Sequence, residues 1–236
     1  MSFRTKASTI AVTAAICTLL APAAMASPGL SHSPVQVTGK KLKGGLLPNS
    51  SFLPGYKTLF ASNSGGSLER GTTFRIPSMK CSDFWLFASN TEGFGETAFA
   101  TETAVSKSAF APVQEIFQQS VYQLASNHAA ITLYGQISAK YKSCKSVTFS
   151  DGNGSTSRET VHSRAAERVG GHQSLLLTVY VTESSVPGPP VVFKTLWTLD
   201  GTDIYMISSG LENVSAPKPT LSSLMLKLIA RVRALK

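Results

Sequence analysis

"VVFKTLWTLDGTDIYMIS", residues 191–208, contains the strongest hairpin signal in the chain. Two runs rich in β-branched and aromatic residues flank the turn sequence Leu199-Asp200-Gly201-Thr202. An Asp-Gly pair suits a type I′ turn, because both central residues of that turn need a positive φ angle. The stretch therefore predicts two neighbouring antiparallel strands, with Asp200 and Gly201 at the centre of the turn between them.

Further strands and helices are indicated around this hairpin. Alternating apolar residues predict strands at 98–105, 116–124 and 175–181. Apolar residues at helical spacing predict one helix that runs to Tyr141 with Asn127 as its N-cap, and another from about Thr220 onward. Helices interspersed among hairpin-linked strands favour an α+β fold, a twisted antiparallel sheet with helices packed on one face.

The first 26 residues have the pattern of a secretory signal peptide. Arg4 and Lys6 precede an apolar run that is too short to span a bilayer, and Ala24-Met25-Ala26 offers a small-x-small cleavage site. We expect cleavage after Ala26, which makes the protein secreted, in the extracellular space or cell envelope. Cys17 lies in the apolar run behind Ile16, where lipid attachment needs a small residue, and is interpreted as an ordinary residue of that run.

Residues 27–45 are rich in Ser, Pro, Gly and Lys and have no periodic apolar pattern, so we interpret them as a flexible tether. Residues 46–236 are then one folded domain. The stretch "GLLPNSSFLPGY", residues 45–56, is predicted to be a structured entry to that domain, with Leu46-Leu47-Pro48 at a helix end and Tyr56 laid against the sheet.

Two cysteines, Cys81 and Cys144, remain after signal cleavage. Because export places them in an oxidising compartment, we expect a Cys81–Cys144 disulfide. Two cysteines without nearby histidines make no tetrahedral metal site, so neither a metal nor another cofactor is expected.

No catalytic pattern stands out, and we expect a protein that is not an enzyme. The nucleophile-elbow motif and a phosphate-binding glycine loop are both missing from the sequence. Some carboxylates are close in sequence: Asp200 and Asp203 bracket a turn, and Glu96 and Glu102 lie along one predicted strand. This proximity alone does not indicate an acid/base pair. Tryptophans on apolar segments belong either to the core or to a pocket. These tryptophans are Trp85 and Trp197. The histidines stand singly in the sequence and are interpreted as surface or hydrogen-bonded residues, not as metal ligands or bases. They are His32, His128, His162 and His172.

The chain is basic, with 22 Lys and Arg against 13 Asp and Glu and a formal net charge of +9. Loss of Arg4 and Lys6 leaves +7. Such a charge attracts anionic wall polymers, lipid headgroups and nucleic acid without specificity, and we expect no specific nucleic-acid partner. It supports an alternative function, that of a basic envelope or adhesive protein on anionic polymers or membrane surfaces.

Several segments taken in order resemble the PknH-like extracellular sensor domain of actinobacteria. The resemblance covers about residues 42–236 and rests on Leu46-Leu47-Pro48, Leu53-Pro54-Gly55-Tyr56, the first cysteine and Tyr141-Lys142-Ser143-Cys144. Tyr141 stands where the family has tryptophan, and the chain lacks cysteines for the second disulfide of the family's kinase sensors.

In that family the domain is fused behind the membrane helix of Ser/Thr kinases or occurs as a stand-alone exported protein. The resemblance implies a twisted antiparallel sheet with helices on one side and a broad cleft that holds an undefined ligand. No kinase domain is expected here, because the chain lacks the glycine-rich loop and the catalytic-loop motif. We therefore expect an exported, non-enzymatic domain that binds an unidentified small ligand or envelope component.

Overall fold

The computed structural model describes residues 37–52, 55–65, 76–90, 96–106, 116–150, 156–184, 190–211 and 219–236. The predicted signal peptide, residues 1–26, and residues 27–36 of the predicted tether lie outside the described residues. Among the helices in the described ranges, none combines the length and the hydropathy that crossing a membrane requires.

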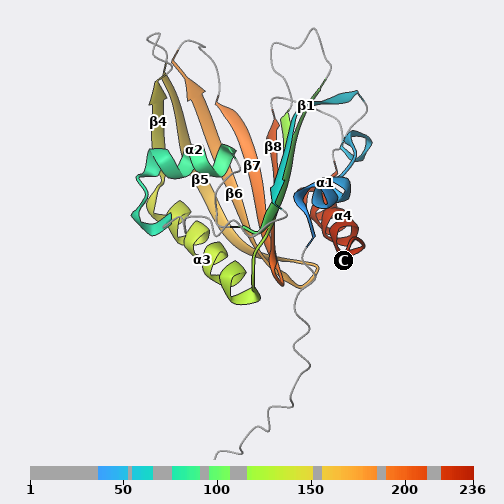
Figure 1. Ribbon diagram of the computed structural model, residues 1–236. Coiled ribbons are helices and arrows are strands. Elements are labelled where there is room, and N and C mark those ends of the chain that lie inside the picture. Colours follow the sequence, from blue (N-terminus) through green and yellow to red (C-terminus); the bar gives the residue numbers. More distant parts are fainter. Residues whose placement is uncertain are drawn as a thin grey trace, which may run out of the picture. The chain divides into compact units, whose positions relative to one another are not determined.

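The described strands form one antiparallel sheet of eight strands in the order β1-β2-β3-β8-β7-β6-β5-β4 (Figure 1). Two meanders, β1 to β3 and β4 to β8, join where β3 pairs with β8. The predicted antiparallel α+β fold is therefore correct. The strands are β1 (Tyr56–Gly65), β2 (Ala98–Ser106), β3 (Ile116–Gln123), β4 (Ser146–Ser150), β5 (Thr156–Val169), β6 (His172–Glu183), β7 (Val191–Asp200) and β8 (Asp203–Leu211).

The hairpin predicted from residues 191–208 is present as β7 and β8. Asp200 pairs with Asp203, so the two loop residues are Gly201 and Thr202, one position later than predicted. Gly201 has a φ of +59°, a conformation that glycine adopts without steric strain. The turn is thus built on the glycine as first central residue, and Asp200 remains in the strand.

Helices cover both faces of the sheet, so the prediction that they pack on one face is wrong. Successive residues of a strand point to opposite faces. In β8, Ile204 and Met206 join an apolar core with α2 and α3, whereas Tyr205 and Ile207 join a second core with α1 and α4. Figure 1 shows these two helix pairs on the two sides of the sheet. The helices are α1 (Gly39–Gly45), α2 (Cys81–Asn90), α3 (Asn127–Ser143) and α4 (Leu221–Arg233), with short 3₁₀ turns at Asn49–Ser51 and Ile76–Ser78.

The last residues of the predicted tether are folded, so the boundary at residue 45 is wrong. Val37 and Leu42 are buried in the core beside α4. The side-chain amide of Gln119 on β3 accepts a hydrogen bond from the Leu47 N–H and donates one to the Leu47 carbonyl, both at 2.8 Å. Gln123 accepts another from the Val37 N–H at 2.8 Å. Buried glutamines thus bind the backbone of the predicted tether at Val37 and of the predicted entry segment at Leu47.

Residues 45–56 form the structured entry predicted from the sequence, as far as they are described. The ring of Phe52 stacks on Phe117 at 4.8 Å, and Tyr56 meets the edge of the same ring at 5.4 Å. Leu53 and Pro54 lie outside the described residues. Phe117 on β3 therefore holds this segment in place where it leads into β1, through ring contacts with both Phe52 and Tyr56.

The predicted disulfide joins Cys81, the first residue of α2, to Cys144, which follows α3, with a Cα–Cα distance of 5.4 Å. The Lys140 ammonium group of α3 donates to the carbonyls of Met79 and Pro77, just before α2. The start of α2 is thus held against the end of α3 by one covalent bond and two hydrogen bonds. This attachment fixes where α2 crosses the sheet.

Replacing both cysteines, Cys81→Ser with Cys144→Ser, should lower the free energy of unfolding by about 4 kcal/mol. The two cysteines are 63 residues apart, and the bond restricts the unfolded chain over that loop. Urea unfolding under identical buffer conditions measures the change. Wild-type protein treated with reductant is the matched control and should unfold at the midpoint of the double variant; an unchanged midpoint in both would contradict the expectation.

Candidate functional site

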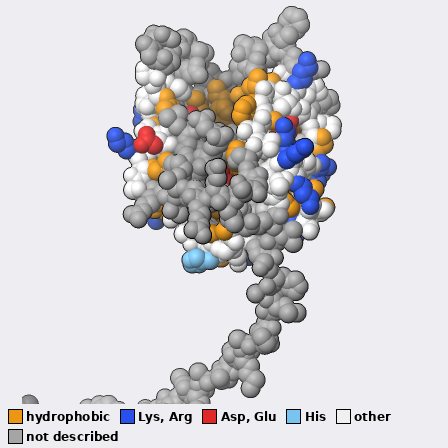
Figure 2. Space-filling model, viewed as in Figure 1, with side chains coloured by type: hydrophobic (Ala, Val, Ile, Leu, Met, Phe, Trp, Pro, Cys, Tyr) orange, Lys and Arg blue, Asp and Glu red, His pale blue; other side chains and the backbone are white. Residues whose placement is uncertain are grey.

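A cavity of about 160 Å³ lies on the sheet face that carries α2 and α3. We call it the cleft. Figure 2 shows hydrophobic side chains gathered in a hollow near the top of the view. The apolar walls of the cleft come from four neighbouring strands, β3, β8, β7 and β6. They are Ile116, Met206, Phe193, Leu177, Val179 and Val181.

Aromatic side chains from three elements also line the cleft: Trp85 of α2, Tyr141 of α3 and Trp197 of β7. The rings of Trp85 and Tyr141 meet edge to face at 5.7 Å. Trp197 lies beside the Tyr141 side chain and stacks on Tyr122 at 6.1 Å. The indole N–H of Trp85 is buried and has no hydrogen-bond partner in the described part of the chain. Trp85 and Trp197 are thus buried core residues that also line the cleft. The sequence left open whether they belong to the core or to a pocket.

Glu159 on β5 is the charged residue among the described side chains of the lining. It pairs with Val147 on β4 and Val181 on β6, two apolar neighbours, and is half-buried. Its carboxylate makes no hydrogen bond or ion pair within the described ranges, and burial raises its pKa. Burial also raises the pKa of Tyr141, and the charge of Glu159 adds to that shift. The two groups therefore lie close enough to influence each other.

A row of polar side chains crosses the cleft on three adjacent strands. Thr195 on β7 and Gln118 on β3 are the register partners of Ser208 on β8. The hydroxyls of Thr195 and Ser208 lie 2.8 Å apart. The cleft thus combines apolar walls with a few fixed hydrogen-bonding groups, the usual composition of a small-molecule site.

Gly210 on β8 makes room for Phe193, one of the apolar walls. A Cβ atom at position 210 would lie 2.3 Å from Cε1 and 2.7 Å from Cζ of the Phe193 ring. The ring therefore lies directly over the glycine backbone. The position of this wall depends on the missing side chain of Gly210.

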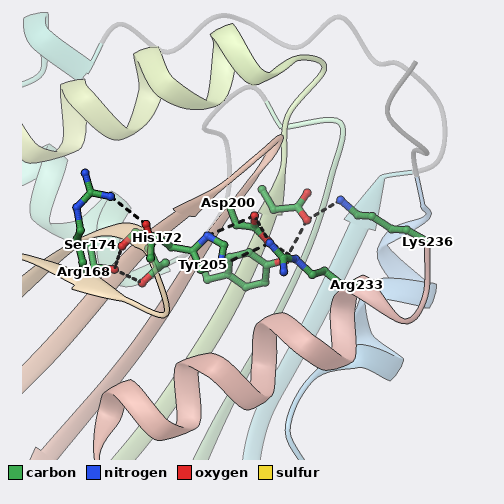
Figure 3. A network of polar contacts seen from close by, with 10 residues as sticks. Arg168, His172, Ser174, Asp200, Tyr205, Arg233 and Lys236 are labelled. Atoms are coloured by element: carbon green, nitrogen blue, oxygen red, sulfur yellow. Dashed lines mark hydrogen bonds and ion pairs between the residues drawn. The ribbon is translucent and has the colours of Figure 1, made fainter. Parts of the chain in front are cut away.

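A second polar cluster lies where the end of α4 meets the β7–β8 hairpin (Figure 3). Arg233 donates two hydrogen bonds to Asp200, at 2.7 and 2.8 Å. Lys236 donates to Asp203 at 2.6 Å, and the Tyr205 hydroxyl donates to the same carboxylate at 3.0 Å. Both carboxylates that bracket the turn are thus engaged in holding α4.

This cluster includes a His–Asp pair, with Nδ1 of His172 3.5 Å from Asp200. A hydrolase would need a nucleophile on the imidazole. The nearby Ser174 hydroxyl instead donates to the His172 carbonyl and lies 3.0 Å from the Thr198 hydroxyl. The cluster therefore joins a helix to a hairpin and offers no nucleophile–base geometry.

The other residues weighed from the sequence are not brought together. The ring of His162 stacks on Tyr180 at 4.3 Å. Glu96 lies near Tyr122, whereas Glu102, on the opposite face of β2, accepts a hydrogen bond from Thr58. His128 is exposed at the start of α3, and His32 lies outside the described residues.

Sequence reasoning missed Glu159. The register of β5 against β6 shifts between Val161 and Ser163, so residues on the two sides of this bulge obey opposite alternation. A regular pattern therefore does not tell which face Glu159 occupies. The available signal for Glu159 was that its segment, β5, directly precedes the strongly apolar strand β6.

No protein-family model matches the sequence, and comparison with curated proteins finds no similar sequence. The structure is similar to the extracellular domain of PknH from Mycobacterium tuberculosis, with a TM-score of 0.55 and 15% sequence identity, over 85% of this chain and 98% of that one. The fold is that of the PknH extracellular domain. The PknH-like fold predicted from the sequence is therefore confirmed.

A second solved structure, an uncharacterized protein from Mycobacterium smegmatis, matches with a TM-score of 0.37 and 12% identity, over 78% of this chain and 92% of that one. The PknH likeness describes the fold of the chain. What the cleft binds has to be argued from its own residues.

Replacing Glu159 by Gln should stabilise the protein at pH 7 and much less at pH 4. Because burial raises the pKa of Glu159 above the value of 4.5 that an unperturbed glutamate has, the folded state favours the protonated carboxyl. Stability is therefore lost as the pH rises from the unfolded pKa through the folded pKa, and the amide avoids this loss. Urea unfolding midpoints at the two pH values measure it.

Glu167→Gln is the matched control, since it makes the same charge change on β5 at a position outside the cleft lining. A stabilisation of equal size in both variants, at both pH values, would show that net charge and not burial of Glu159 is responsible.

Proposed function

We propose that the chain is an exported, non-enzymatic domain of the sensor type, which binds a small ligand in the cleft. The observation that carries this proposal is the cleft itself, about 160 Å³ in volume, with apolar walls and a few polar groups. Sites of this composition bind small molecules, because apolar walls supply affinity and the polar groups fix orientation.

Export is part of the proposal. Its support is the signal pattern that ends at Ala26 and the likeness of the fold to a domain that lies outside the cell. The disulfide suits an oxidising compartment. We therefore propose a protein that is secreted to the extracellular space or cell envelope after cleavage behind Ala26.

Recognition, and not catalysis, is proposed because of the way the polar groups of the cleft are arranged. Thr195 and Ser208 hydrogen-bond each other, Glu159 hydrogen-bonds neither of them, and no described histidine, lysine or cysteine belongs to the lining. A hydroxyl nucleophile needs a base within hydrogen-bond reach. The cleft residues are thus better suited to hold a ligand than to activate one.

Val181→Phe should weaken binding of a small apolar probe, benzyl alcohol, at least about fivefold, because the added ring fills part of the cleft. Both tryptophans of the chain line the cleft, so tryptophan emission reports binding directly. Thr182→Phe is the matched control, because it adds the same ring to β6 at an exposed position on the opposite face. Equal affinities of both variants and the wild type would contradict the proposed site.

The alternative, a basic envelope protein that binds anionic polymers or lipid headgroups, is favoured by one surface. Lys40, Lys41 and Lys43 are exposed on α1, and Lys227 is exposed on the neighbouring α4. Figure 2 shows Lys and Arg side chains gathered on one side of the molecule. These charges are solvated, so they provide attraction that depends on ionic strength.

Salt separates the two proposals. Binding to phosphatidylglycerol vesicles through Lys40, Lys41 and Lys43 should decline strongly between about 20 and about 150 mM salt, because the Debye length shortens. Benzyl alcohol binding in the cleft should keep most of its affinity over that range, because it buries apolar surface. Cosedimentation and tryptophan emission measure the two. Benzyl alcohol affinity that fell in parallel with vesicle binding would contradict the separation.

A further inference from the structure

The charge of the cleft is opposite to the charge of the chain. The sequence carries 22 basic and 13 acidic residues, yet the charged member of the described lining is Glu159. A bound anion would face this carboxylate at close range in a partly desolvated site, where like charges repel strongly. The cleft therefore disfavours anionic ligands although the protein as a whole attracts them.

Glu159 also lacks the counter-charge that a buried carboxylate normally has. In the described residues it forms no ion pair, in contrast to Asp200 and Asp203, which bind Arg233 and Lys236. A half-buried carboxylate without a partner is costly to desolvate. A cation in the cleft would supply the missing partner and remove that cost.

Aromatic rings surround the same space. Trp85, Tyr141, Phe193 and Trp197 all line the cleft together with Glu159. The faces of such rings attract cations, tryptophan most strongly, and aromatic cages with a carboxylate are suited to alkylated ammonium groups. The lining thus combines two independent features that favour a positive charge.

The size of the cleft limits the ligand. A cavity of about 150 Å³ holds a molecule the size of benzene, and the cleft has about 160 Å³. The unpartnered indole N–H of Trp85 is 6% exposed and needs an acceptor atom. A small group with an ammonium centre and an oxygen acceptor fits both conditions.

We propose that the cleft binds a small organic cation, an alkylated ammonium compound with an oxygen acceptor, with Glu159 as its counter-ion and the tryptophans as its aromatic walls. This inference rests on the proposed ligand-binding function of the cleft and adds the chemical class of the ligand.

Choline and 3,3-dimethylbutan-1-ol provide the test, because they have the same shape and differ only in the charged nitrogen that replaces a carbon. Each is titrated into the full chain and followed by tryptophan emission, with sodium chloride added to equal ionic strength. We expect choline to bind at least about fivefold more tightly than the alcohol. Glu159→Gln should reduce this preference strongly, leaving the contribution of the aromatic rings, and Glu167→Gln, the same charge change elsewhere on β5, should keep it in full.

Thermal unfolding of each variant establishes that it is folded before titration. If the alcohol binds as tightly as choline, or if Glu167→Gln loses the preference as fully as Glu159→Gln, the inference is wrong while the ligand-binding function stands. If neither compound binds but benzyl alcohol does, the inference is again wrong and the function stands. If benzyl alcohol also fails to bind, both are overturned.

Discussion

Apolar side chains on both faces of the central strands are the constraint on which this structure depends. In β8 the run Ile204-Tyr205-Met206-Ile207 sends consecutive apolar side chains to opposite faces, and both must be removed from water. Two helix pairs provide the cover, α1 with α4 on one face and α2 with α3 on the other. The cleft lies on the face where α2 is held to α3 by the disulfide. The position of that attachment decides which part of the sheet stays accessible.

Two polar groups of the cleft, the Glu159 carboxylate and the Trp85 indole N–H, lack partners among the described residues, whereas the polar groups that stabilise the fold have them. Gln119 satisfies both backbone groups of Leu47, and Asp203 binds Lys236 and Tyr205. At the cleft, by contrast, Trp85 has a buried donor without an acceptor in the described structure. Unsatisfied groups lower stability, so their position at the cleft agrees with the proposed ligand-binding function.

Much of the fold could be predicted from local patterns. The hairpin, the disulfide and the C-terminal helix, for which Thr220 is the N-cap, all follow from short-range chemistry. The predicted N-cap of α3, Asn127, is wrong by one residue, because the Ser126 hydroxyl accepts the hydrogen bond from the Ala129 N–H. Such errors of one residue arise because adjacent residues both have capping side chains.

What could not be predicted depends on long-range contacts. Val37 is bound by Gln123 across 86 residues of sequence, and no local pattern around Val37 distinguishes the segment from a linker. The shifted register in β5 breaks the alternation along the strand, so the sequence pattern alone does not place Glu159 on the cleft face. Helices cover both faces because the apolar residues of the central strands alternate between two cores. Strand periodicity alone does not show which helix packs on which face. For the tether and for the helices, the deciding partner is far away along the chain.

Gly210 gives the cleft a single adjustable position. Since the Phe193 ring rests directly on the glycine backbone, even one methyl group there must displace the ring, and the apolar wall moves with it. The volume of the cleft therefore depends on a residue that contributes no side chain. A substitution at residue 210 would change that volume without replacing Glu159, the two tryptophans or the covalent link between α2 and α3.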